Sequence, residues 1–597
     1  MLLIYLAVFC CLSPFISYFR TIVRSTEFIL FSTGFCLLLF LLLIPAIRKQ
    51  KTIEVSSIDI GVIFYIVFLG LYFTAKYFSS LPLDPVLFFS SLYLAVFYFI
   101  FRYTLTIRNF RTILAIVVLA GIFQSGYGLI YQKTLFSSHI QLIATFSDSP
   151  LFAAFLMIGT ISVLSAILFY SKIKQKHLFV NMIVFLCLIG LLLLFLYTIA
   201  LTKSRAVFLA LGLSVFILFY VKLKETKRFI LSQKHKYSIA LLFLIALLPI
   251  VYFLYSIRPE SADGRLFIWQ IASEMIKERP VFGFGTDGFR QNYMFYQADF
   301  FRNNPDSPFT NLADNIRLTF NEIIKTGVEQ GIAGLLVLFL LCYLILMAKT
   351  RRKNQQYLLS ILKTLLFSLF IFGLFSYPSD SFRLTFVVVL FIALLSSLSS
   401  GSTRIKIEIK HFLVKNTLMA VSFCFLICLG ISSIRFIDAC KELTKITRTK
   451  SADYSGKTVE LERLYPQLNA TTEFLSYYIS VLGKEEQYDE ALIICKRLED
   501  CYPNSRQQIM KGEIYYSLHF YGEAHQAWIL ASEMVPVLVK PHYLLAKSYY
   551  REREFEKAQV HARCIVDSRP KVYTPEVYYM RKEMAEMINL IIGLEQK

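Results

Sequence analysis

The chain has 597 residues, of which 56% are hydrophobic and only 17% are charged. Because an ordinary soluble domain carries about 25% charged residues, this composition excludes a soluble enzyme of similar length, a disordered chain and a secreted disulfide scaffold. The net charge of +21 lies entirely in residues 1–434, since residues 435–597 hold 23 basic and 23 acidic residues. Short cytoplasmic loops collect such an excess, so we expect a polytopic membrane protein without a nucleic-acid partner.

Apolar segments long enough to cross a bilayer recur along the first 434 residues. A spanning helix needs about 20 mostly apolar residues, and the sequence predicts an all-α membrane bundle with about thirteen spans. They are expected at residues 1–19, 27–47, 58–75, 86–101, 112–131, 150–170, 179–201, 206–221, 237–257, 331–348, 358–377, 384–400 and 412–434. The first segment lacks a basic leader and a small-residue cleavage site, so we expect it to be a span and not a removable signal.

Loop charge predicts how these spans are oriented. One alternating set of loops carries 23 basic residues, whereas the short loops of the other set carry seven. Since cytoplasmic loops are rich in Lys and Arg, we expect the N-terminus to be cytoplasmic. The long loop at about residues 258–330 and the C-terminal segment then lie on the opposite side of the bilayer.

The C-terminal segment at residues 456–597 carries a repeat of 33 to 34 residues. In each copy an aromatic residue is followed three positions later by Ala, and a Pro follows further on. These residues are Tyr488, Ala491, Pro503, Tyr521, Ala524, Pro536, Phe555, Ala558 and Pro570. Ala lets two helices pack closely and Pro ends the second one, which resembles tetratricopeptide repeats. We expect an α-solenoid that binds a protein partner, joined to the bundle by a linker at 435–455. An unrelated helical bundle is the alternative.

Two polar features mark the outward ends of the spans in the middle of the chain. Residues 202–205 read Thr-Lys-Ser-Arg, which places two cations in a loop where the charge bias does not expect them. They fit an anionic head group, although interfacial anchors that snorkel to the membrane surface are the alternative. The long loop carries Asp263 and Arg265, an amphipathic helix at 265–278 and a glycine turn at 283–288. This turn has the GxGxxG spelling but no βαβ context, which excludes a dinucleotide fingerprint.

Two further segments, 144–156 and 314–322, also lie at outward ends of spans. The first contains Asp-Ser-Pro at an expected helix start, and the second places Asn, Arg and Glu at the membrane face. Each of these features also suits an ordinary junction between a loop and a helix.

In this order, the four features resemble the O-antigen ligase and O-antigen polymerase superfamily of bacterial multi-span glycosyltransferases. The resemblance covers about residues 120–400 and implies the inner membrane and a periplasmic loop and tail. It implies transfer of a glycan from polyprenyl diphosphate to an acceptor hydroxyl of a lipid A core, a glycan or a protein. Phe320 stands where the family often has a His that is proposed as catalytic, and Asp148 stands where Asn is usual. A His-dependent mechanism therefore does not carry over, since residues 236–410 contain no His.

The implied reaction needs fixed cations and no metal or other cofactor. Guanidinium groups bind phosphate oxygens in a bidentate way and keep their charge, so we expect Arg205 and Arg265 to hold the diphosphate. Lys203 and Arg290 are expected as helpers in substrate binding.

Glu322 is the preferred catalytic base for the acceptor hydroxyl. We expect Asn321 to orient it and Arg317 to keep it ionised, with Asp263 and Asp314 as further candidates. A purely structural pairing of Glu322 with Arg317 or Lys325 is the alternative.

The sequence leaves the acceptor and the wider class open. A ligase, a polymerase and a protein O-oligosaccharyltransferase differ only in the acceptor. A transporter of lipid-linked glycans would favour charges inside the spans. A non-catalytic assembly scaffold would tolerate the loss of Arg205 and Arg265, whereas an enzyme would not.

Overall fold

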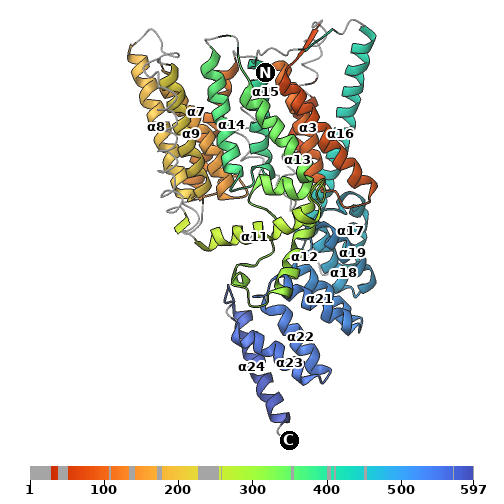
Figure 1. Ribbon diagram of the computed structural model, residues 1–597. Helices are drawn as coiled ribbons and strands as arrows, with labels where there is room; N and C mark the ends of the chain where they lie inside the picture. The colour runs from red at the N-terminus through yellow and green to blue at the C-terminus, as the bar shows by residue number, and fades with distance from the viewer. Residues whose placement is uncertain are drawn as a thin grey trace.

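Helices form most of the protein, as its computed structural model shows (Figure 1). The structure describes residues 29–37, 40, 52–105, 109–132, 142–170, 178–225, 255–256, 259–350, 352, 355–399, 405–408, 412–449, 454–568 and 570–595. The expected span at 1–19 lies outside these residues. Of the expected spans at 27–47 and 237–257, only residues 29–37, 40 and 255–256 are described, as helix.

Nine helices in the described part are long and apolar enough to cross a membrane. They are α3 (Ser57–Phe78), α4 (Pro85–Thr104), α5 (Phe110–Gly126), α7 (Ser149–Leu168), α8 (Leu178–Thr202), α9 (Arg205–Glu225), α13 (Glu322–Met347), α14 (Gln356–Gly373) and α16 (Phe412–Arg448). A shorter apolar helix is α15 (Phe382–Leu398), and α5 continues into the π-helical turn η3 (Tyr127–Gln132). This arrangement agrees with the expected polytopic helix bundle, in which each of these helices overlaps an expected span.

Three helices differ from the expectation in where they begin or end. α13 starts nine residues before the expected span and contains a break at Gly331, whose φ of 62° is not helical. α14 ends at Gly373, four residues early. α16 continues to Arg448, so the first part of the expected linker at 435–455 is helical. The all-α expectation also missed a small antiparallel sheet formed by β1 (Thr52–Val55) and β2 (Ile405–Glu408).

Helix α7 lies at the centre of one half of the bundle and packs on α5, α8, α9 and α14. Gly121 of α5 and Gly159 of α7 both face the buried ring of Phe195 on α8. A Cβ atom at either glycine would come within 2.9 Å of that ring. Small residues therefore let these three helices approach closely, which is how helices associate in a bilayer.

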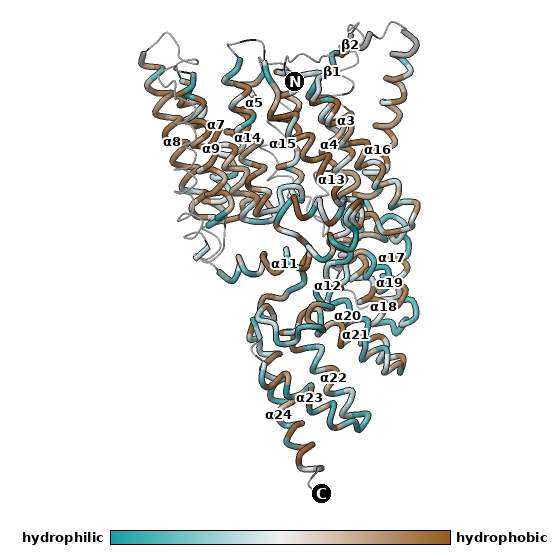
Figure 2. The backbone as a smooth tube through the Cα atoms, in the orientation of Figure 1, coloured by the Kyte–Doolittle hydropathy of each residue, from teal (hydrophilic) through white to brown (hydrophobic). Residues whose placement is uncertain are grey.

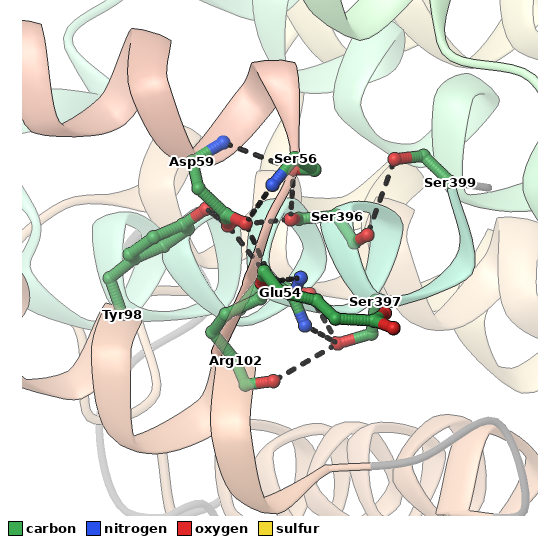
Figure 3. A network of polar contacts seen from close by, with 9 residues as sticks. Glu54, Ser56, Asp59, Tyr98, Arg102, Ser396, Ser397 and Ser399 are labelled. Atoms are coloured by element: carbon green, nitrogen blue, oxygen red, sulfur yellow. Dashed lines mark hydrogen bonds and ion pairs between the residues drawn. The ribbon is translucent and has the colours of Figure 1, made fainter. Parts of the chain in front are cut away.

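A buried polar network joins α3, α4 and α15 near the small sheet (Figure 3). The carboxylate of Asp59 accepts hydrogen bonds from Tyr98 at 2.6 Å, Ser396 at 2.6 Å and Nε of Arg102 at 2.9 Å. It also accepts one from the backbone N–H of Ser56 at 2.7 Å, which completes a capping box at the start of α3. These contacts fix three helices at the end of the bundle that carries β1 and β2.

The C-terminal segment, called the tail from here on, consists of helices that each pack on the next. They are α17 (Tyr454–Leu468), α18 (Thr472–Lys484), α19 (Tyr488–Cys501), α20 (Ser505–Ser517), α21 (Tyr521–Met534), α22 (Val539–Arg551), α23 (Phe555–Asp567) and α24 (Pro575–Glu595). The repeated aromatic residues begin α19, α21 and α23, and Ala491, Ala524 and Ala558 are fully buried. These positions suit the expected packing role of Ala, while the repeat type stays a prediction.

The tail and the long loop lie at the same end of the bundle, and the two strands lie at the other end (Figure 1). Apolar residues gather over the bundle helices, whereas the tail is more polar (Figure 2). Two described turns from the loops expected to carry few basic residues, 79–84 and 378–381, bind the long loop through Gln291 and Glu322, so they lie at the tail end, called the tail side below. This separation agrees with the loop-charge pattern, and it leaves the cytoplasmic assignment of the opposite end a prediction.

The tail packs directly on helix α12 (Gly288–Asn303), which belongs to the long loop. Arg302 binds both carboxylate oxygens of Glu533 at 2.6 and 2.9 Å. Gln297 donates to the backbone oxygen of Met534 at 2.6 Å, and Met534 shares an apolar core with α11 (Pro259–Glu278) and α12. The loop and the tail are therefore joined by an apolar core with polar contacts around it.

Candidate functional site

Helix α11 runs across the tail side of the bundle (Figure 1). It begins at Pro259, earlier than the expected start at 265, so Asp263 and Arg265 both lie on the helix. Its buried face packs against α12 and α13. The expected amphipathic surface helix is thus present, with its apolar face covered by protein.

Arg265 lies among residues from three other segments. Its Nη1 donates to the backbone oxygen of Phe375 at 2.8 Å, and its guanidinium lies 5.2 Å from the centre of the Phe320 ring. Burial, and then the positive charge of Arg205, lower the pKa of Arg265. Two arginines 60 positions apart are therefore close enough to repel each other, and Arg205 is the first residue of α9.

Phe320 connects Arg265 to Tyr377. Its φ of 53° is unusual for a residue with a side chain, and its ring meets that of Tyr377 edge-on at 5.3 Å. The backbone beside it is held because Nε1 of Trp269 on α11 donates to the oxygen of Thr319 at 2.8 Å. Phe320, at the position where the resembled family often has His, therefore lies against Arg265. Its ring cannot exchange a proton.

Tyr377 leads to Asp148, the residue just before α7. Burial raises the pKa of Tyr377, and so does the negative charge of Asp148. The phenol therefore keeps its proton. Arg205, Arg265, Phe320, Tyr377 and Asp148 are called the arginine cluster below.

Sequence reasoning missed the segment 374–381, because it assigned the span 358–377 there. The helix α14 stops at Gly373, and residues Pro378–Asp380 form the short 3-10 helix η7. The run Tyr-Pro-Ser-Asp at 377–380 was an available signal, since Pro cannot continue a helix.

Asn321 and Glu322 begin α13. Oδ1 of Asn321 accepts hydrogen bonds from the N–H groups of Ile323 and Ile324, at 2.9 and 3.1 Å, so this side chain caps the helix. Oε1 of Glu322 accepts from the N–H of Ser379 at 2.9 Å. Both expected site residues are therefore at the tail side, where they hold α13 and η7 in place.

Two expected substrate-binding arginines lie away from Arg265. Arg317 lies over the ring of Tyr502 in the tail, at 4.4 Å, and the cation that acts on Glu322 is Lys325. Arg290 binds Asp84 at 3.1 Å and Asp287 at 2.5 Å. Burial by itself lowers the pKa of Arg290, but these two carboxylates raise it above its usual value. Arg317 thus connects the loop to the tail, and Arg290 connects it to the α3–α4 turn.

The remaining expected residues lie at the edge of the site. Lys203 is exposed in the α8–α9 turn with a φ of 53°. Asp263 accepts a hydrogen bond from Tyr255 at 2.9 Å. Among the described residues, no group of three or more His, Cys, Asp and Glu side chains is arranged to hold a metal ion.

The glycine turn after α11 is joined to the break in α13. The N–H groups of Phe284 and Gly285 donate to the oxygens of Val328 and Glu329, at 2.9 and 2.8 Å. In return, Ile332 donates to the oxygen of Pro280 at 2.8 Å. The turn therefore satisfies backbone groups that the broken helix would leave unpaired in the membrane region, and it fixes α11 on the bundle.

The central part of the chain is similar to a known family. Residues 190–339 match the family model of the O-antigen ligase, and this stretch includes Arg205, Arg265 and Glu322. No curated protein matches the chain. The match supports the superfamily and a membrane glycan-transfer function in general terms.

Proposed function

We propose that this protein is a glycosyltransferase that moves a glycan from polyprenyl diphosphate to an acceptor hydroxyl on the tail side of the membrane. The observation that carries the proposal is the position of Arg265 in the matched region, where it binds the oxygen of Phe375 and where burial and the charge of Arg205 lower its pKa. Positive charges of this kind at a partly buried site favour an anionic ligand. A diphosphate is such a ligand, since guanidinium groups bind phosphate oxygens in a bidentate way.

The reaction places charge where these arginines are. When the bond between the sugar C1 and the diphosphate oxygen breaks, the electron pair stays on the diphosphate. A positive and a negative unit charge 4 Å apart attract by about 4 kcal/mol at an effective dielectric constant of about 20. The N-terminus of α9, where Arg205 lies, adds a partial positive charge. Exposed Lys203 attracts the anionic head group at the entrance.

The acceptor hydroxyl loses a proton to a carboxylate on the same side. Glu322 is the sequence-based candidate, with Asp263 at the edge as another, and Asn321 supports Glu322 by capping the helix on which it lies. The donor is a lipid-linked glycan in a bacterial inner membrane whose periplasmic side is the tail side. The acceptor decides between a ligase, a polymerase and a protein O-oligosaccharyltransferase.

Release of free polyprenyl diphosphate by the purified full-length protein in lipid nanodiscs tests the proposal. The donor is polyprenyl-diphosphate glycan from the host, with host membranes as the source of acceptor. We expect Arg265→Ala to lower the release rate about 100-fold, the usual effect of losing one donor to a transition-state anion. Arg265→Lys keeps the positive charge but lacks the planar guanidinium, so its release rate should lie between those of the wild type and Arg265→Ala.

Arg279→Ala is the matched control, because Arg279 is an exposed arginine in the same loop that packs on Phe284. It should release the product at the wild-type rate. Equal rates for Arg265→Ala and Arg279→Ala would refute the proposed function and favour a scaffold.

A further inference from the structure

We propose that the tail positions Phe320 and Arg265 for glycan transfer, and that it does so through Asn315. This residue lies in residues 313–320 of the long loop, called the connecting segment below, which contacts the tail at one end and Arg265 at the other. The inference rests on the proposed function, because it gives the tail a part in that reaction. Asn315 is a positioning residue and does not touch the reacting atoms.

The side chain of Asn315 binds the first residue of the tail helix α20. The N–H of Ser505 donates to Oδ1 of Asn315 at 2.9 Å, and Nδ2 of Asn315 donates to the Ser505 hydroxyl at 2.9 Å. Ser505 is fully buried. The first N–H groups of a helix have no partner within it, so Asn315 satisfies one of them from a position 190 residues away in the chain.

Two further tail residues contact the connecting segment on either side of Asn315. Nζ of Lys571 donates to the oxygen of Ala313 at 2.5 Å, and the guanidinium of Arg317 lies 4.4 Å from the centre of the Tyr502 ring. Ala313 and Tyr502 also share the apolar core that joins the loop to the tail. The tail therefore contacts every second residue of the first half of the connecting segment.

Side chains of the loop helices bind the connecting segment between these points and beyond them. Nε2 of Gln297 on α12 donates to the oxygen of Asp314 at 3.0 Å, and Nε1 of Trp269 on α11 donates to the oxygen of Thr319 at 2.8 Å. The segment forms neither helix nor strand up to Thr319, so its backbone groups need such partners. The path of the chain from the tail to Phe320 is thus fixed by contacts along its length.

The connecting segment ends at Phe320, whose φ of 53° lies in the left-handed region. A residue with a side chain keeps such a conformation only when the surrounding structure holds it. The guanidinium of Arg265 lies 5.2 Å from the centre of the Phe320 ring. Loss of the contacts at Asn315 therefore lets Phe320 leave this conformation, and Arg265 then loses the ring that orients its guanidinium.

A second contact between the tail and the loop separates attachment from positioning. Arg302 on α12 binds both carboxylate oxygens of Glu533 at 2.6 and 2.9 Å, and the Arg302 side chain is 53% exposed. This ion pair attaches the tail to α12 but lies outside the connecting segment. Its loss should loosen the tail without moving Phe320, whereas loss of the Asn315 contacts should act on Phe320.

The test measures release of polyprenyl diphosphate over a range of donor concentrations, per molecule of folded full-length protein in nanodiscs. Asn315→Ala should lower kcat about 10-fold, less than the about 100-fold that a misplacement of about 1 Å can cost. KM for the donor should change little, because Arg265 keeps its charge. Asn315→Asp keeps an acceptor oxygen for the N–H of Ser505, at a helix end that favours negative charge, so it should retain most of kcat.

Glu533→Ala is the matched control in the tail, and Asn303→Ala is the control in the loop, since Asn303 is exposed. Both variants should keep the wild-type kcat. Asn315→Ala with the kcat of Glu533→Ala would overturn the proposal, and so would an Asn315→Asp variant that is as slow as Asn315→Ala. An inactive Arg265→Ala in the same series leaves the proposed function intact.

A purely structural role of Asn315 predicts a different result. It would lower the yield of folded protein and leave kcat per folded molecule unchanged, which overturns the positioning role. If Asn315→Ala does not fold, Ser505→Ala and Lys571→Met remove the hydroxyl and the ammonium group that contact the connecting segment from the tail. A wild-type kcat in both of these variants would then overturn the proposal, and a lower kcat at unchanged KM in either one supports it.

Discussion

Replacing Asp59 by Asn tests how far the buried network of Figure 3 stabilises the bundle. The side chains of Arg102 and Asp59 are 10% and 2% exposed, with Nε and Oδ1 at 2.9 Å. The variant leaves the guanidinium buried without its carboxylate, and breaking such a pair costs about 3–5 kcal/mol. Asn also turns one acceptor oxygen into a donor. Its NH2 group then faces either Tyr98 and Ser396, which both donate to Oδ1, or the N–H of Ser56, which donates to Oδ2.

Thermal unfolding of the purified protein in one detergent measures this effect. We expect the apparent melting temperature of Asp59→Asn to fall by several degrees. The control is Glu274→Gln, which breaks an exposed pair with Lys277 at 2.8 Å and should cost about 0–1 kcal/mol. At a temperature where the variant stays folded, its product release should equal that of the wild type, because the network lies at the end of the bundle away from Arg265. A melting temperature equal to that of Glu274→Gln would refute the reasoning.

Three further predictions concern the loop and the tail. Gly331→Ala places a Cβ against the oxygen of Val281 at a positive φ. It should lower the free energy of unfolding by about 2–3 kcal/mol and reduce the yield of folded protein. The control Gly264→Ala adds its Cβ in open space on α11 and should not reduce the yield. Glu533→Ala removes the partner of the Arg302 guanidinium, and hydrogen exchange of α12 should become faster than in the wild type; unchanged exchange would contradict the contact. Burial and nearby His561 lower the pKa of His542 to about 4, below about 6.5 in the unfolded chain. Tail stability should then be full above pH 6.5 and fall as the pH decreases toward 4, and His542→Phe should flatten this dependence in hydrogen exchange.

The spans could be predicted because their signal is local. α8 was expected at 179–201 and runs from Leu178 to Thr202, since the length and hydropathy of one segment set its bounds. The start of α13 could not be found in this way. Its first turns are polar, and hydropathy does not detect a polar helix at the membrane surface. The cap formed by Asn321 was the available local signal.

The sequence could select candidate cations for the site, but it could not show which of them the fold pairs with carboxylates or aromatic rings. Arg205 was selected because cations are unexpected in its short outward turn, and Arg265 because the resemblance and the diphosphate chemistry favour an arginine there; the charge of Arg205 lowers the pKa of Arg265. Arg290 was expected as a helper, but it binds Asp287 and also Asp84, a residue 206 positions away. Arg317 lies over Tyr502 of the tail. Such long-range pairs depend on the tertiary fold, so loop charge alone could not separate binding residues from structural ones.

The contacts between the tail and the loop connect the tail to the segment that carries Phe320, while partner binding by the tail stays a prediction. Ser505 and Asn315 exchange hydrogen bonds, in which the N–H of Ser505 donates at 2.9 Å and Nδ2 of Asn315 donates at 2.9 Å. Lys571 donates to the backbone oxygen of Ala313 at 2.5 Å. Phe320, which lies against Arg265, follows only a few residues later in the chain. The tail is therefore bound to Ala313 and Asn315, which belong to the same segment of the long loop as Phe320 of the arginine cluster.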